Sequence, residues 1–436
     1  MTRNTRTSIS AVNLSRRQLL GIGGGIAAGI GLAACGAGGT ASGGGASGGS
    51  GKPGTLRIWA NSAVAGEADS GLKRAAKAFG EAKGLTVQVE GIPTADLVSK
   101  LTTAVSGGSG PDIAIVDSSA VPQLASAKVL TDVSDLTGSV SGDFHAGALE
   151  YSTFGGKQFG LPYYTNNVGL FYNKAMLADA GVAVPTTWDD LRSASIELTG
   201  GDQYGYMMGP AGYGAFLFWP WLWQNGGQIV SGDATKAVFD DAKGLEAFEA
   251  YANLALKDGV APPDFLAATG GWDPYVAPFA QERVAMMAIG PWGQNAITQN
   301  NPDLDWGVAP LPQGTEKATI LGGATISLAG NATAPDEAWE FMEWVTAGEQ
   351  MEYIQASGNI PGRKDVIDSA WATEDPVRQV FVEQMEFARA RPALPIWGDI
   401  EWGVFANAWD SVIQGQASPA DALHSAAQQA TEKLSS

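Results

Sequence analysis

Hydrophobic and polar positions between residues 55 and 116 follow the order strand, helix, strand, helix, strand. The apolar run at 56–59 predicts one short strand, and the alternation of Leu85, Val87 and Val89 predicts a second. The continuous apolar run at 113–116 predicts a strand buried on both faces. Between the strands, two sets of apolar residues at helical spacing predict helices: Leu72, Ala75, Ala76 and Phe79, then Leu97, Leu101 and Val105. This alternation indicates a parallel sheet covered by helices on both faces.

Further along the chain, capping residues mark the expected starts of helices. Thr94 is placed to cap the second of the helices above, and Thr-Trp-Asp-Asp at 187–190 fits a capping box. Ser-Pro-Ala-Asp at 418–421 supplies an N-cap serine, a proline at the first helical position and an acid at the third. The run at 169–172 predicts another strand, with Leu177 and Ala180 in a short helix after it. A further amphipathic helix is predicted from its apolar residues Ala338, Phe341, Met342 and Val345.

Polar residues follow two of the predicted strands directly. Asn61 and Ser62 follow the first strand, and Asp117, Ser118 and Ser119 follow the strand at 113–116. Ligands of parallel sheets bind beyond the carboxyl ends of the strands, so these five residues are candidates for a binding site. Ordinary turn polarity is the alternative, because Ser, Asp and Asn are common in any loop.

Tryptophan is abundant, with 14 residues, and several lie in segments flanked by Gly and Pro. Residues 216–223 read FLFWPWLW, and Trp272, Trp292 and Trp402 lie in other Gly/Pro-rich segments. A pyranose presents a face of C–H groups that an aromatic ring can cover, so such rings suit a carbohydrate ligand. For Trp292 and Trp402, packing within the protein is an equal alternative. The tryptophans assigned to the core are Trp59, Trp221, Trp223, Trp339, Trp344 and Trp409.

Composition excludes several classes of protein. The 436-residue chain is 45% hydrophobic, enough to build a real core, and its length suits two or three packing units. A formal net charge of −19 argues against nucleic-acid binding, which needs clustered Lys and Arg. One cysteine and two histidines leave no intramolecular disulfide and little metal or triad chemistry, so we expect no cofactor and no metal.

The first 54 residues have the layout of an export signal followed by a linker. Arg16 and Arg17 in a basic leader resemble a twin-arginine signal, and the apolar stretch at 19–34 is too short and glycine-rich for a good membrane span. Leu-Ala-Ala-Cys at 32–35 resembles a bacterial lipobox, which implies that Cys35 is lipidated; a lone buried or reactive thiol is the alternative. Residues 1–34 are thus the expected signal, and the Gly/Ser-rich residues 35–54 a lipid-anchored tether.

Several short motifs, in order along the chain, resemble the extracellular solute-binding proteins of the sugar class, typified by maltose-binding protein. Each is weak alone, and their order and spacing behind a lipobox carry the resemblance. The motifs are GPDI at 110–113, LP at 161–162, GLFYNK at 169–174, AG at 180–181, PTTWDDL at 185–191, FAQERVAMM at 279–287, GPW at 290–292, APLP at 309–312, AWEF at 338–341 and the helix start at 420–423.

The resemblance implies a two-lobed α/β fold of the periplasmic-binding-protein type, with a ligand cleft between the lobes and a crossover hinge. The crossovers would fall near 164–168, 321–325 and 371–377. Lobe 1 would comprise residues 55–164 with 326–372, and lobe 2 residues 165–325 with 373–436.

The resemblance also implies which residues face a ligand. Trp292 and Trp402 match sugar-stacking aromatic residues, and Asn166 stands where maltose-binding protein has a carboxylate. Val116 and Ala120 replace a tryptophan and an arginine of that protein, which argues against maltose itself. Arg363 is either a cleft residue or a surface charge. The full expected ligand-binding set is Asn61, Ser62, Asp117, Ser118, Ser119, Tyr164, Asn166, Phe216, Trp219, Trp272, Trp292, Gly323, Asn359, Arg363, Glu401 and Trp402.

The family's function is capture without chemistry. A neutral di- or oligosaccharide would bridge the lobes, close the hinge, and be delivered to the transmembrane subunits of an ABC permease driven by an ATPase. The neutral ligand is indicated by the absence of an Arg/Lys cluster in the expected cleft loops. The protein would be a monomer on the outer face of the cytoplasmic membrane, touching the membrane only through its lipid.

Three alternatives remain open from the sequence. A secreted glycoside hydrolase would use tryptophans with two carboxylates, for which Asp399 and Glu401 are the best pair and Asp240 with Asp241 a poorer one. A binding protein for a non-sugar solute such as a glycerophosphodiester is the second, and a purely structural lipoprotein is the third.

Overall fold

The computed structural model describes residues 54–66, 70–266, 273–367 and 369–435. The expected signal, the lipidation site at Cys35, most of the tether and Trp272 lie outside the described residues. None of the described helices is long and apolar enough to cross a bilayer.

The predicted strand–helix alternation at the start of the fold is confirmed. Strands β1 (Thr55–Asn61), β2 (Thr86–Ile92) and β3 (Ile113–Asp117) alternate with helices α2 (Gly71–Lys83) and α3 (Thr94–Ser106). Every apolar residue predicted on the inner face of α2 is buried, and 113–116 is buried throughout. The predicted role of Thr94 is wrong: Pro93 is the N-cap, no side chain caps the helix, and Thr94 is its first residue.

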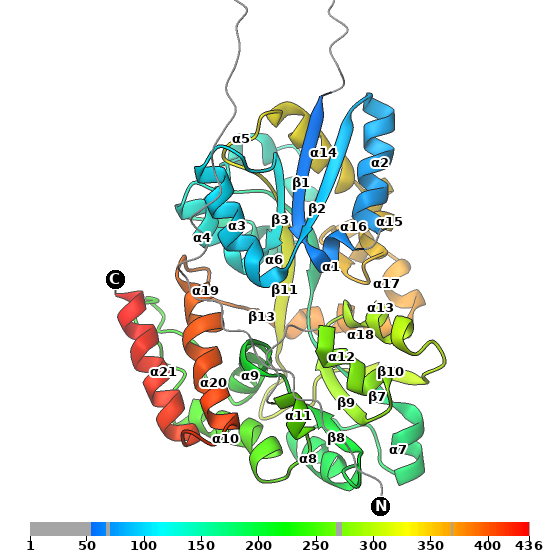
Figure 1. Ribbon diagram of the computed structural model, residues 1–436, viewed down its shortest axis with the longest axis vertical. Helices are drawn as coiled ribbons and strands as arrows, with labels where there is room; N and C mark the ends of the chain where they lie inside the picture. The colour runs from blue at the N-terminus through cyan, green and yellow to red at the C-terminus, as the bar shows by residue number, and fades with distance from the viewer. Residues whose placement is uncertain (1–53, 67–69, 267–272, 368, 436) are drawn as a thin grey trace, which may run out of the picture. The chain divides into compact units, whose positions relative to one another are not determined.

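A seven-stranded sheet has the order β12-β6-β11-β3-β1-β2, in which β12 is Ile360–Pro361, and β13 (Ala388–Ala390) pairs with β11 (Figure 1). Strands β1, β2 and β3 are parallel as predicted, but β11 (Thr319–Leu328) runs antiparallel to β3 and to β6 (Leu161–Asn166). The parallel arrangement predicted for these three strands is therefore confirmed, and the sheet as a whole is mixed. The reason is connectivity, since β6 leads the chain away to a second sheet and β11 brings it back in the reverse direction.

The second sheet has four strands in the order β10-β7-β9-β8. These are β7 (Gly169–Asn173), β8 (Tyr204–Met207), β9 (Val284–Ile289) and β10 (Trp306–Ala309). The predicted strand at 169–172 is β7, and helix α7 (Lys174–Ala180) follows it. Helix α8 (Trp188–Glu197) begins with the predicted capping box, in which Thr187 and Asp190 each bond the other's backbone.

The largest hydrophobic core joins the four-stranded sheet to a group of helices. These are α9 (Ala211–Gln224), α10 (Ala242–Leu256), α20 (Ala406–Ile413) and α21 (Pro419–Leu434). Ser418 caps α21 as predicted. On the seven-stranded sheet, α14 (Pro335–Val345) buries all four of its predicted apolar residues.

The remaining elements are short. They are α1 (Ser62–Ala65), η1 (Ser118–Ala120), α4 (Val121–Ser126), α5 (Ser134–Thr137), η2 (Ser141–Asp143), α6 (Ala146–Tyr151), β4 (Thr153–Phe154), β5 (Lys157–Gln158), α11 (Pro263–Leu266), α12 (Asp273–Ala280), α13 (Gly293–Asn300), η3 (Gly348–Gln350), α15 (Met351–Gln355), β12 (Ile360–Pro361), α16 (Lys364–Ile367), α17 (Trp371–Glu374), α18 (Pro376–Gln384), η4 (Met385–Phe387), β13 (Ala388–Ala390), α19 (Trp397–Asp399) and the π-helix η5 (Ile400–Phe405).

A buried network of polar side chains ties together the segments that connect the two sheets. Gln384 donates to Asn167 Oδ1 at 3.1 Å and accepts from the Leu311 amide at 3.0 Å. Asn167 donates to the Phe381 carbonyl at 2.7 Å, and the Thr319 hydroxyl donates to the Val168 carbonyl at 2.8 Å. Because Asn167, Gln384 and Thr319 are all fully buried, these bonds fix how the connecting segments pass one another.

Candidate functional site

The polar residues predicted at the strand ends lie together at one edge of the seven-stranded sheet. Asn61 ends β1 and caps α1 by accepting from the Val64 amide at 2.9 Å. Asp117 ends β3, and its Oδ1 accepts from the Ser119 amide at 2.8 Å and from the Ser119 hydroxyl at 2.6 Å. Ser118 is buried and shares a hydrogen bond of 3.2 Å with Thr325 of β11. Ser62 is exposed on α1.

The backbone of β11 approaches β6 closely beside these residues. A Cβ on Gly323 would lie 2.4 Å from the Tyr164 carbonyl, and one on Gly322 would lie 2.5 Å from Asn166 Oδ1. Only glycine fits at 323, where the clash is with backbone, whereas a Cβ at 322 would displace the end of the Asn166 side chain. Asn166 donates to Asn359 at 3.0 Å, so two residues predicted separately from distant parts of the chain lie in contact. Tyr164 is hydrogen-bonded to Asn61, and burial raises the pKa of its phenol.

The aromatic segment at 216–223 is a helix, α9, buried on almost all sides rather than an exposed loop. Phe216 is the residue of this segment nearest the site. Its ring stacks on that of Trp402, with centroids 6.2 Å apart and planes 13° apart, and on Tyr213 at 5.7 Å. Trp402 is 49% exposed, the one large exposed aromatic side chain in the described residues. It therefore presents a flat apolar face to solvent.

Trp219 and Glu401 have a different place from the one expected. Both are fully buried, and Trp219 Nε1 donates to Glu401 Oε1 at 2.9 Å. Neither side chain reaches a surface in this structure, so a direct contact with a ligand stays a prediction. Glu401 points inward from the π-helix η5, while the next residue, Trp402, faces out.

Arg391 is a central residue of the site that the sequence analysis missed. Its guanidinium is 4% exposed and donates to Glu401 Oε2 at 2.9 Å and to Asp117 Oδ1 at 3.0 Å. It also lies 5.4 Å above the Phe216 ring. Arg391 thus links the end of β3 to the π-helix, 274 residues apart from Asp117 along the chain.

Electrostatics keep this arginine charged. Burial works against the charge, but the Asp117 and Glu401 carboxylates outweigh it and raise the pKa of Arg391 above its ordinary value. Burial raises the pKa of Glu401, and the Arg391 guanidinium opposes that shift. The three groups therefore act as one coupled cluster.

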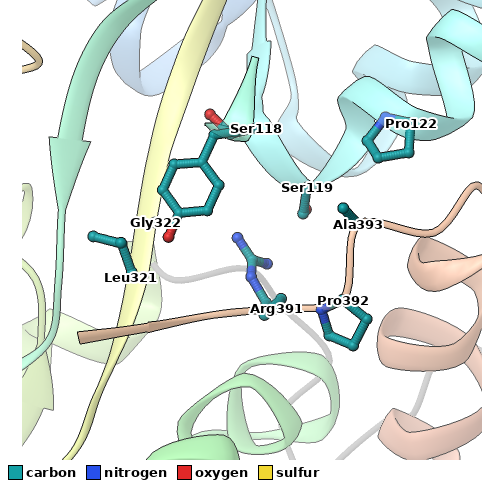
Figure 2. Close-up of a pocket in the computed structure, with 9 residues that line it drawn as sticks. Ser118, Ser119, Pro122, Leu321, Gly322, Arg391, Pro392 and Ala393 are labelled. Atoms are coloured by element: carbon teal, nitrogen blue, oxygen red, sulfur yellow. The ribbon is translucent and has the colours of Figure 1, made fainter. Parts of the chain in front are cut away.

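A small cavity opens beside Arg391. Figure 2 shows the guanidinium pointing into the space between Ser118, Ser119 and Leu321. Tyr151 also lines the cavity, and its buried hydroxyl has no hydrogen-bond partner in the described residues, nor does Arg391 Nε. The complete lining is Ser118, Ser119, Pro122, Tyr151, Leu321, Gly322, Arg391, Pro392 and Ala393. Unpartnered buried donors of this kind suit a ligand that carries hydroxyl groups.

Trp292 and Arg363 lie elsewhere. The Trp292 ring folds over Gly290, where a Cβ would lie 1.8 Å from it, and the neighbouring Pro291 carbonyl abuts Gly358, next to Asn359. This brings the Gly-Pro-Trp turn against the loop that precedes β12. Arg363 is 14% exposed, bonds Asp365 at 2.9 Å and Asp143 at 3.3 Å, and does not line the cavity.

The acid pairs considered for a hydrolase have other partners. Glu401 is buried against Arg391, and Asp399 forms an ion pair of 3.7 Å with Lys433. Asp240 bonds His424 at 2.8 Å, and Asp241 caps α10. Within the described residues no group of three His, Cys, Asp or Glu side chains is arranged to hold a metal ion.

A second hollow lies on the outer side of Trp402. Its lining comes from α19, η5, α20 and α21 and consists of Gly398, Asp399, Trp402, Gly403, Val404, Asn407, Gln429 and Lys433. Trp402 thus borders a polar, open surface on one side and Phe216 on the other.

Comparisons with known proteins extend this picture. A binding protein of Brucella abortus is 27% identical over 368 residues, covering 81% of this chain and 87% of the relative. A solved ABC transporter solute-binding protein from Thermotoga lettingae, bound with α-D-tagatose, is 29% identical with a TM-score of 0.81, covering 87% of this chain and 99% of that one. The cyclic α-maltosyl-1,6-maltose binding protein of Arthrobacter globiformis is 27% identical with a TM-score of 0.71, covering 88% and 99%.

These likenesses confirm the predicted fold class, an α/β fold of the two-lobed solute-binding type. The family model described as bacterial extracellular solute-binding protein matches residues 63–352, well over half of the chain. The chain therefore belongs to the bacterial extracellular solute-binding protein family.

Proposed function

We propose that this chain is the solute-binding subunit of an ABC importer and that its solute is an uncharged carbohydrate. The observation that carries the proposal is the exposed Trp402 ring, stacked on Phe216 beside a cavity lined with hydroxyls. An aromatic face next to polar groups matches the two surfaces of a sugar ring. Two relatives of the same fold add support: one is bound with α-D-tagatose, and the other is named as a cyclic α-maltosyl-1,6-maltose binding protein.

Binding would draw residues 55–164 with 326–372 and residues 165–325 with 373–436 together as two lobes around the solute. The buried network of Asn167, Thr319 and Gln384 is the proposed hinge, because it ties the segments between the two sheets. A solute drives such closure only through contacts that the closed form adds. The bound form would then deliver intact solute to the permease.

A thermal-shift screen of the purified full-length protein, in a detergent without a sugar headgroup, tests the proposal. The panel contains mono-, di- and trisaccharides, polyols, amino acids and glycerophosphodiesters. A ligand at a hundredfold excess over its Kd adds about 2.7 kcal/mol of stability, which gives a clear shift. A shift with one group of sugars supports the proposal, and a flat panel from folded protein contradicts it.

The aromatic platform is tested with two tryptophan variants. Trp402→Ala should weaken sugar binding roughly tenfold or more through loss of the stacking face. Trp339→Ala, on α14 and away from the cavity, is the control and should leave affinity unchanged. Release of cleaved sugar by the wild-type protein would instead favour a hydrolase.

We further propose that the protein is exported by the twin-arginine route and anchored through lipid on Cys35. Two acyl chains hold a protein at a membrane where one does not. Cys35→Ser should move the protein from the membrane fraction to the soluble fraction after export. Replacing both Arg16 and Arg17 by lysine should instead stop export altogether. A membrane-bound C35S protein would contradict the anchor.

A further inference from the structure

The arginine beside the cavity differs from the arginines that proteins use to bind anions. An anion site presents a guanidinium whose positive charge is not already paired with carboxylates of the protein. Arg391 instead donates from Nη1 to Glu401 and from Nη2 to Asp117, at 2.9 and 3.0 Å. The positive charge that Arg391 brings to the cavity lining is thereby paired with two carboxylates behind it.

We infer that the Asp117–Arg391–Glu401 cluster is a specificity device that admits uncharged hydroxyl groups to the cavity and rejects carboxylates and phosphates. The inference deepens the proposed function and rests on it for the statement that the solute is a sugar. Neutral sugars would be admitted to the cavity, and uronic acids and sugar phosphates would be excluded.

The geometry explains how rejection arises. An anion in the cavity would meet Arg391 with its charge already compensated by Asp117 and Glu401. These two carboxylates would repel a further negative charge, the fully buried Glu401 more strongly than Asp117, whose side chain is 48% exposed and partly screened by solvent. Two buried polar atoms have no partner at all in the described part of the chain, Arg391 Nε and the Tyr151 hydroxyl.

Those two donors suit neutral hydroxyls. A phenol both donates and accepts, and Arg391 Nε donates, so a sugar hydroxyl can satisfy them without bringing charge. Burial raises the pKa of Tyr151 far above its ordinary value, which keeps the phenol protonated. The cavity therefore offers hydrogen bonds but no net positive charge.

The test removes one compensating carboxylate and looks for a gain of anion binding. Asp117→Asn keeps an oxygen that can accept from Ser119 but deletes the charge that faces Arg391. The probes are glucuronate and inorganic phosphate, measured by calorimetry on the full-length protein. We expect neither probe to bind the wild type measurably. We expect D117N to bind them at least about tenfold more tightly than the detection limit that the wild type sets.

Asp143→Asn is the matched control. It also removes one negative charge beside a largely buried arginine, Arg363, but outside the cavity. D143N should therefore gain nothing, whereas an equal gain would attribute the effect to net charge and overturn the inference. Glu401→Gln is a second route to the same uncompensated Arg391 if D117N is poorly folded, and it should show the same gain.

Two other outcomes overturn the inference. One is binding of glucuronate or phosphate to the wild type with the affinity of the variant. The other is a folded D117N or E401Q protein that still ignores both probes. Failure of the sugar screen is a separate result, because it contradicts the proposed function while the anion experiment still reports on the cluster.

Discussion

At the scale of single residues, Arg391 carries the most consequence. It is 4% exposed, and both of its carboxylate partners come from other elements. A buried ion pair stabilises a protein little compared with a well-packed apolar pair, but breaking one by removing a single partner is costly. The stability that each residue of the cluster contributes therefore depends strongly on whether its partner is present.

Arg391→Met should destabilise the protein by about 3–5 kcal/mol, because Glu401 is left buried without its cation. The double variant R391M/E401Q should recover most of that loss, since the side-chain amide that replaces the carboxylate can still accept from Trp219. Urea unfolding of the wild type, both single variants and the double variant measures this. Additive losses in the double variant would show that the two side chains are not coupled.

Asp132 gives a residue-scale prediction about pH. Hydrogen bonds from Lys157 and Ser134 lower its pKa from 3.8 to about 2. A pKa lowered by folding contributes stability above the ordinary carboxyl pKa, and this is lost as pH falls from about 4 to about 2. Asp132→Asn should thus make stability fall less steeply in that window, as measured by urea midpoints from about pH 5 to about pH 2. An unchanged slope would contradict the prediction.

At the scale of elements, the π-helix η5 decides which side chains face the site. Its wider turn lets Glu401 reach Arg391 while Trp402 lies on Phe216. π-turns occur rarely and often at functional sites, because the extra residue redirects its neighbours. Gly403 lies within this turn, and a Cβ there would meet nothing within 4 Å.

Deleting Gly403 should convert the π-turn to an ordinary α-turn and rotate Trp402 by about 100° relative to α20. We expect loss of the Trp402–Phe216 stack and of sugar binding. Gly403→Ala keeps the residue count and has open space, so it should bind as the wild type does. Retained binding after the deletion would show that the turn does not position Trp402.

At the scale of the whole molecule, the buried network around Gln384 connects segments that lie far apart in the sequence. Gln384 satisfies Asn167, which is 217 residues away, and the Leu311 amide. A buried polar group that loses its partner keeps the full cost of its desolvation. The network thus holds the packing of the two sheets' connections in one arrangement.

Gln384→Leu should cost about 3 kcal/mol, because Asn167 Oδ1 and the Leu311 amide lose their partner. Gln379→Leu, also on α18, is the control and should cost far less, since Gln379 bonds only an exposed Glu383. Denaturant unfolding compares the two. Equal losses would mean that the effect comes from α18 and not from the network.

How much the sequence predicts differs between local and long-range features. The hydrophobic pattern predicts β3 and α14, and the residue types at 187–190 predict the capping box. Each of these features depends on residues that are close together in the chain. The strand-end residues Asn61 and Asp117 follow from a general rule for parallel sheets. The reversed direction of β11 does not follow from that rule, because it depends on where the chain returns from the second sheet.

Arg391 escaped sequence analysis for a similar reason. Arg389 and Arg391 look alike in Ala-Arg-Ala-Arg-Pro, yet Arg389 pairs with Glu316 on the surface while Arg391 is buried. Only the folded chain brings Asp117 next to Arg391. Trp219 and Trp402 likewise both lie near prolines, although one is buried and the other exposed. Helical periodicity in the sequence does not reveal the extra residue of a π-turn.

The glycine pair of β11 has an evolutionary consequence. Gly322 contributes bare backbone to the cavity, and the neighbouring Gly323 has no room for even a methyl group because the Tyr164 carbonyl of β6 lies against it. Mutation at Gly323 cannot diversify this floor without displacing β6. New ligand preferences must therefore arise in the walls, at Ser119, Tyr151 and the 392–393 segment, because Arg391 is itself held by its two carboxylates. The fold thus restricts inheritable change in specificity to the loops and helix ends around an unchanging strand.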